Sequence, residues 1–423
     1  MDNIIDVLRG RDLLEATTSP TLEEESGKRQ LTVYAGFDPT AESLQAGNLV
    51  AIMGLMHFQR CGHKVVALVG GATGMIGDPS GKTAERPLLD ENKVLENLAG
   101  IRENLERFLD FEHPTAPAMI VNNYDWFRQY PFIDFLRDVG RHFRMGSMLG
   151  KDSVRTRLDS ETGMSFTEFS YQLLQAYDFL HLYDELGCCV QLGGSDQWGN
   201  ITAGTDLVRK LRGQEVFGVT LPLVCDRHGQ KFGKSAGNAI YLSEAKTSVY
   251  DFYQYFLRVD DADVIHLMRV FTLLTGDEIR AYAQEVDAAP EKRAAQKRLA
   301  EEITRRVHGE EGLSRAQQSA AVLFGEAMDG LDADALLAVF AQVPSCALSR
   351  DLVAGQPVVA VAAEAGLCKS RSEARRLIQN GGCYVNNQRV EDVDAVIAPA
   401  SIIDDRLVVL RSGRKRYQLI RVT

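Results

Sequence analysis

The chain has 423 residues, of which 45% are hydrophobic and 25% are charged. This composition is ordinary for globular proteins and provides apolar material for two or three domains. The net charge of −11 argues against binding nucleic acid over the whole surface, but it does not exclude a local basic patch. No run of about 18 apolar residues occurs, so the sequence predicts no transmembrane helix.

The charge is unevenly distributed along the chain. From Gly366 onward the sequence contains eleven Lys and Arg residues against six Asp and Glu residues, a net charge of +5, so the preceding residues carry −16. An acidic body followed by a basic segment predicts that the segment meets an anion such as RNA. The alternative is a solvated surface with a random fluctuation of charge.

The seven cysteines form no CxxC pair, are odd in number and are irregularly spaced. This pattern indicates neither a disulfide framework nor a zinc site, and we expect reduced, apolar cysteines in a cytoplasmic protein. The first ten residues contain early acids and no long apolar core, so they do not resemble a signal or transit peptide.

Near-continuous apolar strands alternate with helical segments over residues 1–220. Such strands are typical of a parallel sheet covered on both faces, so we expect an α/β domain. The expected strands are 31–35, 64–69, 119–121 and 188–192, and the expected helices are 49–60, 132–139, 166–180 and one that begins at 201.

Glycine and aspartate follow three of these strands, at 36–38, 70–78 and 193–196. Ligands of open α/β sheets bind in the crevice outside the carboxyl ends of the strands. The turn at 36–48 also opens a helix, whose free N–H groups favour phosphate. Each feature alone is weak, but their convergence predicts a binding site for a phosphorylated ligand.

The helix expected at 166–180 carries Tyr171, Gln175 and Asp178 on one face. Such a polar face is usually the solvated side of a helix. A phenol and a carboxylate, rather than Lys and Glu, favour a pocket instead.

A strand is expected at 221–226 and a turn at 227–230, followed by the loop Lys231-Phe-Gly-Lys-Ser235. Two lysines beside a glycine suit a polyanion, because their charge stabilises a leaving pyrophosphate without proton transfer. Lys82 and Arg86 lie on another expected loop and suit phosphate in the same way. A solvated surface cation is the alternative for each.

The 231–235 loop is a close variant of the KMSKS loop of class I aminoacyl-tRNA synthetases, and residues 45–48 stand where that family has its HIGH tetrapeptide. Together with the stretches at 36–40, 70–81, 167–178 and 193–200, these motifs make the whole chain resemble the bacterial tyrosyl-tRNA synthetases. The resemblance implies a Rossmann-like catalytic domain at 1–220, the KFGKS loop region at 221–245, an α-helical anticodon-side domain at 246–343, a linker at 344–357 and a small α+β RNA-binding domain at 358–423.

The implied activity is a tyrosine–tRNA ligase. Tyrosine and ATP form tyrosyl-adenylate and pyrophosphate, and the tyrosyl group then passes to the terminal adenosine of the tRNA. Magnesium is expected with the ATP, although the sequence shows no metal-ligand cluster, and a homodimer is expected from the family.

The resemblance also implies a role for individual residues. Those implied for tyrosine are Tyr34 and Asp178 at the phenol, Asp78, Tyr171 and Gln175 at the ammonium group, Asn123 and Gln191 in the wall, and Gln197 and Asp38 at the carboxylate. Those implied for ATP are Gly36, Asp38, Thr40, Gly47, Asn48, Gly193 and Asp196. Those implied for catalysis and the pyrophosphate are Thr40, Gln45, Asn48, Lys82, Arg86, Lys231, Lys234 and Ser235.

The sequence departs from the family at the HIGH position, which reads Gln45-Ala-Gly-Asn48. Both histidines are absent, so we expect an active enzyme that stabilises the γ-phosphate less well. Two alternatives stay open at this point. One is an RNA-binding paralogue without catalysis, and the other is a sister synthetase for tryptophan.

The second half is expected to be helical from 246 to 343, with one long helix at 292–308, and to end in a domain similar to a small ribosomal-protein RNA-binding domain. Two basic clusters there suit RNA phosphates. They are Lys369, Arg371, Arg375 and Arg376 in the first, and Arg411, Arg414, Lys415 and Arg416 in the second.

Overall fold

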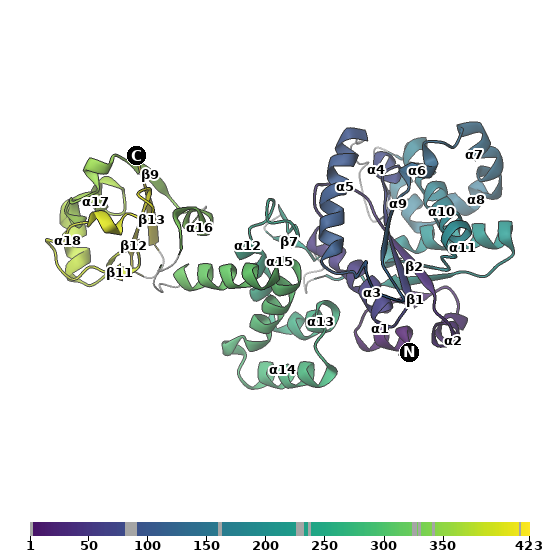
Figure 1. The fold of residues 1–423 in the computed structure, drawn as a ribbon, viewed down its shortest axis with the longest axis horizontal. Coiled ribbons are helices and arrows are strands. Elements are labelled where there is room, and N and C mark those ends of the chain that lie inside the picture. The colour runs from purple at the N-terminus through teal and green to yellow at the C-terminus, as the bar shows by residue number, and fades with distance from the viewer. Residues whose placement is uncertain are drawn as a thin grey trace. The chain divides into compact units, whose positions relative to one another are not determined.

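The computed structural model describes residues 3–80, 91–159, 163–225, 232–235, 238–323, 328, 331–340, 343–413 and 416–423. These residues form two compact units (Figure 1). The first contains residues 1–247 and 251–309, and the second contains 248–250 and 310–423. None of the described helices combines the length and the apolar character needed to span a membrane.

The first unit is built on a six-stranded sheet in the order β1-β6-β5-β2-β3-β4. All neighbours are parallel except the short edge strand β1, which pairs antiparallel to β6. The strands are β1 (Ala16–Thr17), β2 (Thr32–Phe37), β3 (Lys64–Val69), β4 (Met119–Asn122), β5 (Val190–Gly194) and β6 (Phe217–Leu221). The expected parallel sheet is confirmed.

One expected strand is wrong. The strand placed at 221–226 is instead β6, which ends at Leu221. Pro222 follows and has no N–H to donate, so the ladder stops there. Gly218 and Thr220 interrupt the apolar run, which is why the sequence pattern hid this strand.

Helices cover the sheet. In the first unit they are α1 (Ile4–Gly10), α2 (Thr21–Lys28), α3 (Leu49–Arg60), α4 (Thr73–Ile76), α5 (Glu91–Glu106), α6 (Tyr124–Phe127), α7 (Phe132–Asp138), α8 (Met145–Leu149), α9 (Asp152–Leu158), α10 (Phe166–Leu186), α11 (Trp198–Arg212), α12 (Val249–Leu257), α13 (Asp261–Phe271) and α14 (Gly276–Ala288). Short 3-10 turns lie at η1 (Ala46–Asn48), η2 (Gly140–His142), η3 (Ser195–Gln197) and η4 (Pro290–Lys292).

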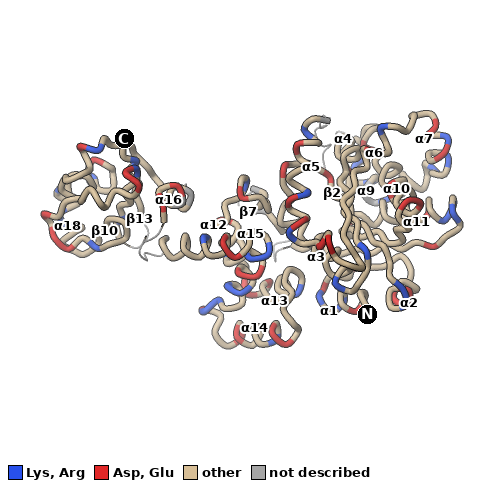
Figure 2. The backbone as a smooth tube through the Cα atoms, viewed as in Figure 1, with Lys and Arg blue, Asp and Glu red and all other residues tan. Residues whose placement is uncertain are grey.

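The helix expected at 49–60 is confirmed as α3, which is buried along most of its length. The helix α10 is longer than expected and stops at Gly187, whose φ of +61° starts the turn into β5. Acidic and basic positions alternate along α5 (Figure 2). They form exposed ion pairs such as Arg102–Glu106, so this face is solvated and contributes little stability.

The helix α15 (Ala294–Leu323) covers the long helix expected at 292–308 and extends beyond it. Its backbone breaks at Gly309, where φ is +74°, and this is the residue at which the first unit ends. The helical segment expected at 246–343 is therefore divided between the two units.

The second unit holds a five-stranded sheet in the order β11-β10-β12-β13-β9. Its elements are α16 (Ala333–Val339), β9 (Ser345–Leu348), η5 (Arg350–Leu352), α17 (Val358–Glu364), α18 (Arg371–Gln379), β10 (Cys383–Val385), β11 (Gln388–Arg389), η6 (Pro399–Ser401), β12 (Leu407–Ser412) and β13 (Arg416–Val422). Alternate residues of β12 bury both faces of the sheet. Val408 joins α17 and α18 in one core, and Val409 joins Phe340 in the other.

The linker expected at 344–357 is corrected by this sheet. Residues 345–348 form β9, which pairs in parallel with β13. The proline and small residues that suggested a linker flank this edge strand and its following turn.

Candidate active site

A cavity of about 200 Å³ lies at the carboxyl ends of β2 and β5. Most of the side chains that the sequence assigned to tyrosine line it together, although they come from distant parts of the chain. The lining residues are Tyr34, Gly36, Phe37, Asp38, Asn48, Leu68, Thr73, Asp78, Tyr171, Gln175, Asp178, Gln191, Leu192 and Gln197.

Three buried polar atoms in this cavity have no hydrogen-bond partner. They are the Tyr34 hydroxyl, Gln175 Oε1 and Gln191 Oε1. The Tyr34 ring is held edge-on to Phe179, with 5.3 Å between the ring centres. Burial, together with the Asp178 charge, raises the pKa of Tyr34 well above its usual value, so its hydroxyl stays a donor. Unpaired buried polar atoms are rare in folded proteins, and three in one cavity indicate a polar ligand.

Asp178 is fixed by two hydrogen bonds. Asn123 Nδ2 donates to Oδ2 and Trp126 Nε1 donates to Oδ1, each at 3.0 Å. Burial, with a smaller effect of the Asp38 charge, raises the pKa of Asp178 well above its usual range. Asn123 is fully buried behind Asp178 and does not line the cavity, so its expected place in the wall is corrected to a supporting one. Trp126 was not recognised in the sequence.

Asp78 anchors a second polar network. It accepts hydrogen bonds from Gln197 Nε2 at 2.6 Å, from the Ser80 N–H at 2.9 Å and from Asn200 Nδ2 at 3.3 Å. Gln175 Nε2 donates to Gln197 Oε1 at 3.3 Å and extends the network to α10. The Asp78 carboxylate is thereby held at the cavity wall.

Asp38 accepts from the Tyr171 hydroxyl and from Thr73 Oγ1, both at 3.0 Å. A Cβ at Gly70 would lie 2.2 Å from Asp38 Oδ1. The glycine that was expected to admit a ligand therefore makes room for a side chain of the protein itself. Thr73 also escaped sequence analysis, although it lies within the glycine-rich stretch.

The turn at 45–48 is held by its own atoms and by the backbone of the KFGKS region. Asn48 Oδ1 accepts from the Gln45 N–H at 2.9 Å. The Ala46 N–H donates to Ile240 O at 2.8 Å, and the Leu242 N–H donates to Leu44 O at 2.9 Å. These bonds hold the expected ATP turn without either of the missing histidines.

The backbone of the KFGKS loop fits closely against this turn. Gly233 has a φ of +95°, and a Cβ there would lie 2.7 Å from Gly47 N. Its N–H donates to the Tyr255 hydroxyl at 2.8 Å. Phe232 stacks on Phe271, with 5.1 Å between ring centres, and packs against Tyr255. Phe232 thus anchors the loop in the helical part of the first unit.

Several expected residues do not line the cavity. Gly193 is the penultimate residue of β5, and Asp196 lies in η3. Thr40 is exposed, and its N–H donates to Asp38 O at 2.9 Å. Lys82, Arg86, Lys231, Arg414 and Lys415 lie outside the described residues. Lys234 and Ser235 form the backbone of β7, which pairs with β8 (Asn238–Ala239).

A buried ion pair, which the sequence pattern did not reveal, braces the start of α10. Arg157 of α9 is 0% exposed and donates to Glu168 through Nε at 2.7 Å and Nη2 at 2.8 Å. Ser165 caps the same helix end by accepting from the Glu168 N–H at 3.1 Å. The helix that carries Tyr171, Gln175 and Asp178 is therefore fixed near its first turn.

The basic helix of the second unit is confirmed as a structure. Ser370 caps α18, and Lys369, Arg371, Arg375 and Arg376 are exposed. Arg411 does not join the second basic cluster, because it is buried, stacks on Tyr384 at 3.8 Å and donates to Gly413 O. Arg416 is exposed at the start of β13.

Two family models match the chain. "tRNA synthetases class I (W and Y)" matches residues 25–325, and "Tyrosine--tRNA ligase SYY-like C-terminal domain" matches residues 336–420. Among the described residues, no group of three or more His, Cys, Asp and Glu side chains is placed to hold a metal ion.

Proteins and solved structures similar to this chain are tyrosine–tRNA ligases, also called tyrosyl-tRNA synthetases. A tyrosine–tRNA ligase of Protochlamydia amoebophila is 55% identical over 425 residues, covering 100% of this chain and 99% of its own length. The ligase of Bacillus caldotenax is 49% identical and covers 98% of both chains. A truncated mitochondrial tyrosyl-tRNA synthetase of Aspergillus nidulans superposes with a TM-score of 0.69 at 30% identity, covering 77% of this chain and 95% of its own.

Proposed function

The chain belongs to the tyrosine–tRNA ligases of the class I synthetase family, and we propose that the cavity between β2, β5 and α10 is its tyrosine site. The enzyme uses ATP as a substrate and joins tyrosine to tRNA. The observation that carries the proposal is the set of three unpaired buried atoms on Tyr34, Gln175 and Gln191.

The phenol of tyrosine is placed between Tyr34 and Asp178. Tyr34 stays protonated and donates, while Asp178, held by Asn123 and Trp126, accepts. Phenylalanine would leave the buried Tyr34 hydroxyl unpaired and would give Asp178 no donor from the substrate. Discrimination of this kind reaches about 10⁵, a value known from this family itself.

The ammonium group is assigned to Asp78, Tyr171 and Gln175, which approach the cavity from the loop after α4 and from α10. The carboxylate then faces Gln197 and the ATP end. It is already a nucleophile, so activation needs positioning and charge stabilisation rather than a general base.

The ATP end is assigned to Gly36, Asp38, Thr40, Gly47, Asn48, Gly193 and Asp196, and the leaving pyrophosphate to Gln45, Lys82, Arg86, Lys231, Lys234 and Ser235. The backbone bonds that join the 45–48 turn to the KFGKS region support this assignment. Mg²⁺ would enter with the ATP substrate and would supply positive charge at its phosphates, without a dedicated protein cage.

Pyrophosphate exchange with tyrosine, with tryptophan and with no amino acid tests the assignment. Exchange is expected only with tyrosine, because Asp178 and Tyr34 match a phenol rather than an indole. Exchange with tryptophan would reassign the cavity. No exchange with either would leave an RNA-binding paralogue.

The exposed basic residues of α18 are assigned to tRNA phosphates. Reversing two charges, Arg371→Glu with Arg375→Glu, is expected to lower kcat/KM for tRNA charging at least tenfold while pyrophosphate exchange stays unchanged. The matched control reverses Arg102 on the solvated face of α5. Unchanged charging would remove the RNA-binding role.

We assign the interface of a homodimer to an exposed apolar surface of the first unit. Large side chains on α7, α8, α9 and the start of α10 are 38–70% exposed: Phe132, Ile133, Leu136, Met145, Leu149, Leu158 and Phe166. Exposed apolar clusters of this kind mark protein interfaces, and identical chains pair such surfaces by two-fold symmetry. Phe132→Asp with Ile133→Asp is expected to give monomers in sedimentation. We assign the enzyme to the cytoplasm, where it would meet its tRNA substrate.

A further inference from the structure

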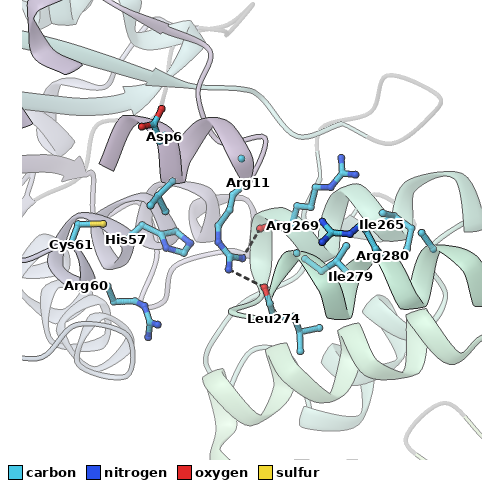
Figure 3. Close-up of a pocket in the computed structure, with 14 residues that line it drawn as sticks. Asp6, Arg11, His57, Arg60, Cys61, Ile265, Arg269, Leu274, Ile279 and Arg280 are labelled. Carbon is cyan, nitrogen blue, oxygen red and sulfur yellow. Dashed lines mark hydrogen bonds between the residues drawn. The ribbon is translucent and has the colours of Figure 1, made fainter. Parts of the chain in front are cut away.

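A second cavity lies at the opposite end of α3 from the tyrosine site. There the ends of α1 and α3 face α13 and α14 (Figure 3). It has a volume of about 600 Å³, within the range of sites for small ligands. Basic groups dominate its polar lining: Arg11, His57, Arg60, Arg269 and Arg280. None of the residues assigned to tyrosine, ATP or tRNA lines it.

His57 is the buried polar group of this cavity. Its side chain is 3% exposed, and its Nε2 has no hydrogen-bond partner. In Figure 3 its ring lies beside the Arg11 side chain and near Arg60. Burial and the two arginine charges lower the pKa of His57 to about 3. The neutral ring still leaves its Nε2 buried without a hydrogen-bond partner, which is costly unless a polar group of a ligand meets it.

The two nearest arginines carry no compensating acid. Arg11 donates to three backbone carbonyls, Arg269 O at 3.3 Å, Thr272 O at 2.6 Å and Leu274 O at 2.9 Å, which leave its positive charge uncancelled. Arg60 is exposed and has no hydrogen bond or ion pair within the described part of the chain. Burial, with a smaller effect of the Arg60 charge, lowers the pKa of Arg11.

The remaining charged groups at the cavity are already paired. Arg269 binds Asp12 at 2.9 Å, Arg280 binds Asp277, and the one lining carboxylate, Asp6, binds Arg9 at 2.6 Å. The net field inside the cavity is therefore positive, and it comes from Arg11 and Arg60.

The opposite wall carries apolar side chains besides the paired Arg269 and Arg280. Leu274 and Ile279 are buried, and Ile265 is half-buried, on the side formed by α13 and α14. A cationic end next to an apolar wall fits a molecule with a charged head and a flat or apolar body. We propose that this cavity binds a small phosphorylated molecule of nucleotide size, with its phosphate at Arg11, Arg60 and His57 and its body against Ile265, Leu274 and Ile279.

The test uses the full chain with its active site filled by a non-hydrolysable tyrosyl-adenylate analogue, so that binding elsewhere is measured. AMP and inorganic phosphate are the probes in calorimetry. AMP is expected to bind more tightly than phosphate, because only AMP reaches the apolar wall. Equal affinities would overturn a ligand of nucleotide size.

Arg60→Gln removes the unpaired charge at an exposed position and leaves pyrophosphate exchange unchanged. A charge-assisted hydrogen bond contributes about 1.5–3 kcal/mol, so AMP affinity is expected to fall about tenfold or more. The matched control is Arg102→Gln on α5, which leaves AMP affinity unchanged. Unaltered binding in Arg60→Gln would overturn the proposal.

Histidine-selective ¹³C NMR of the unmutated, analogue-filled chain gives a second readout. This readout does not depend on a substitution in the cavity. The His57 signal, assigned by its loss in His57→Gln, is expected to move during the AMP titration. A signal that does not move, or tighter Arg60-dependent binding of a short single-stranded RNA than of AMP, would overturn the small-molecule site.

Discussion

The two ends of the proposed active site are built differently. At the tyrosine end, buried and half-buried side chains fix one another: Asn123 and Trp126 hold Asp178, and Gln197 holds Asp78. At the ATP end, the bonds that join the 45–48 turn to the 240–242 segment run between backbone atoms. Side-chain substitutions are therefore expected to lower activity strongly at the tyrosine end. The ATP end is expected to tolerate substitutions that keep its backbone hydrogen bonds.

This difference explains how the chain accommodates Gln45 and Asn48 in place of two histidines. The turn depends on the Ala46 N–H and the Leu44 carbonyl, which every residue type except proline provides. Asn48 adds a bond to the Gln45 N–H that fixes the turn locally. Substitutions at 45 and 48 are therefore expected to change the chemistry at the proposed ATP end without changing the backbone of the turn.

Asp178→Ala should have the largest effect, because it leaves Trp126 Nε1 and the substrate phenol without an acceptor and removes one of the two acceptors of Asn123 Nδ2. The value of kcat/KM for tyrosine in pyrophosphate exchange is expected to fall about a thousandfold, which corresponds to about 4 kcal/mol. Asp125→Ala, an exposed neighbour on α6, is the control and should match the unmutated chain. A loss below tenfold would contradict recognition by Asp178.

Glu168→Gln breaks the buried ion pair that braces α10 and leaves the buried Arg157 charge without the Glu168 carboxylate. The free energy of unfolding is expected to fall by about 3–5 kcal/mol. Urea unfolding followed by tryptophan fluorescence measures it, since both tryptophans, Trp126 and Trp198, lie in the first unit.

Asp184→Asn is the matched control for that ion pair, because it breaks the partly exposed pair with Arg212 and is expected to cost about 1 kcal/mol or less. Replacing both buried partners, Arg157→Met with Glu168→Leu, should restore much of the stability. Equal losses in Glu168→Gln and Asp184→Asn would show that the buried pair is not a brace.

Gly233→Ala tests the backbone contact at the ATP end. The new methyl group meets Gly47 N, and the positive φ adds strain of about 1–3 kcal/mol. The rate of pyrophosphate exchange is expected to fall about ten- to a hundredfold, with tyrosine affinity unchanged by equilibrium dialysis. Gly213→Ala, which has a φ of +66° but open space around it, controls for the backbone strain alone. Weaker tyrosine binding in Gly233→Ala would erase the distinction between the two ends.

Gln45→His should have the smallest effect. The backbone holds the turn, so the fold is expected to be unchanged, and the imidazole should raise the exchange rate about threefold by meeting the γ-phosphate. The gain should be larger at pH 6 than at pH 8, because histidine is protonated below about 6.5. A lower rate would identify Gln45 as adapted to this site.

The sequence alone determined the elements whose pattern is local. Apolar runs marked β2, β3 and β5, and the spacing of Tyr171, Gln175 and Asp178 placed all three on the face of α10 that lines the cavity. Glycines after the strands marked the binding edge, because parallel strands bring their carboxyl ends together. The family motifs then identified tyrosine and ATP as the expected ligands.

Tertiary structure decided the partners. Asp38 meets Tyr171 across 133 positions, Trp126 meets Asp178 across 52, and Arg11 meets Leu274 across 263. No spacing or periodicity encodes such pairs, because they arise only when separate elements pack. Burial likewise turned Arg411 from an expected RNA contact into a stacked core residue, and it gathered Arg11, His57 and Arg60 into a cavity that the sequence did not reveal.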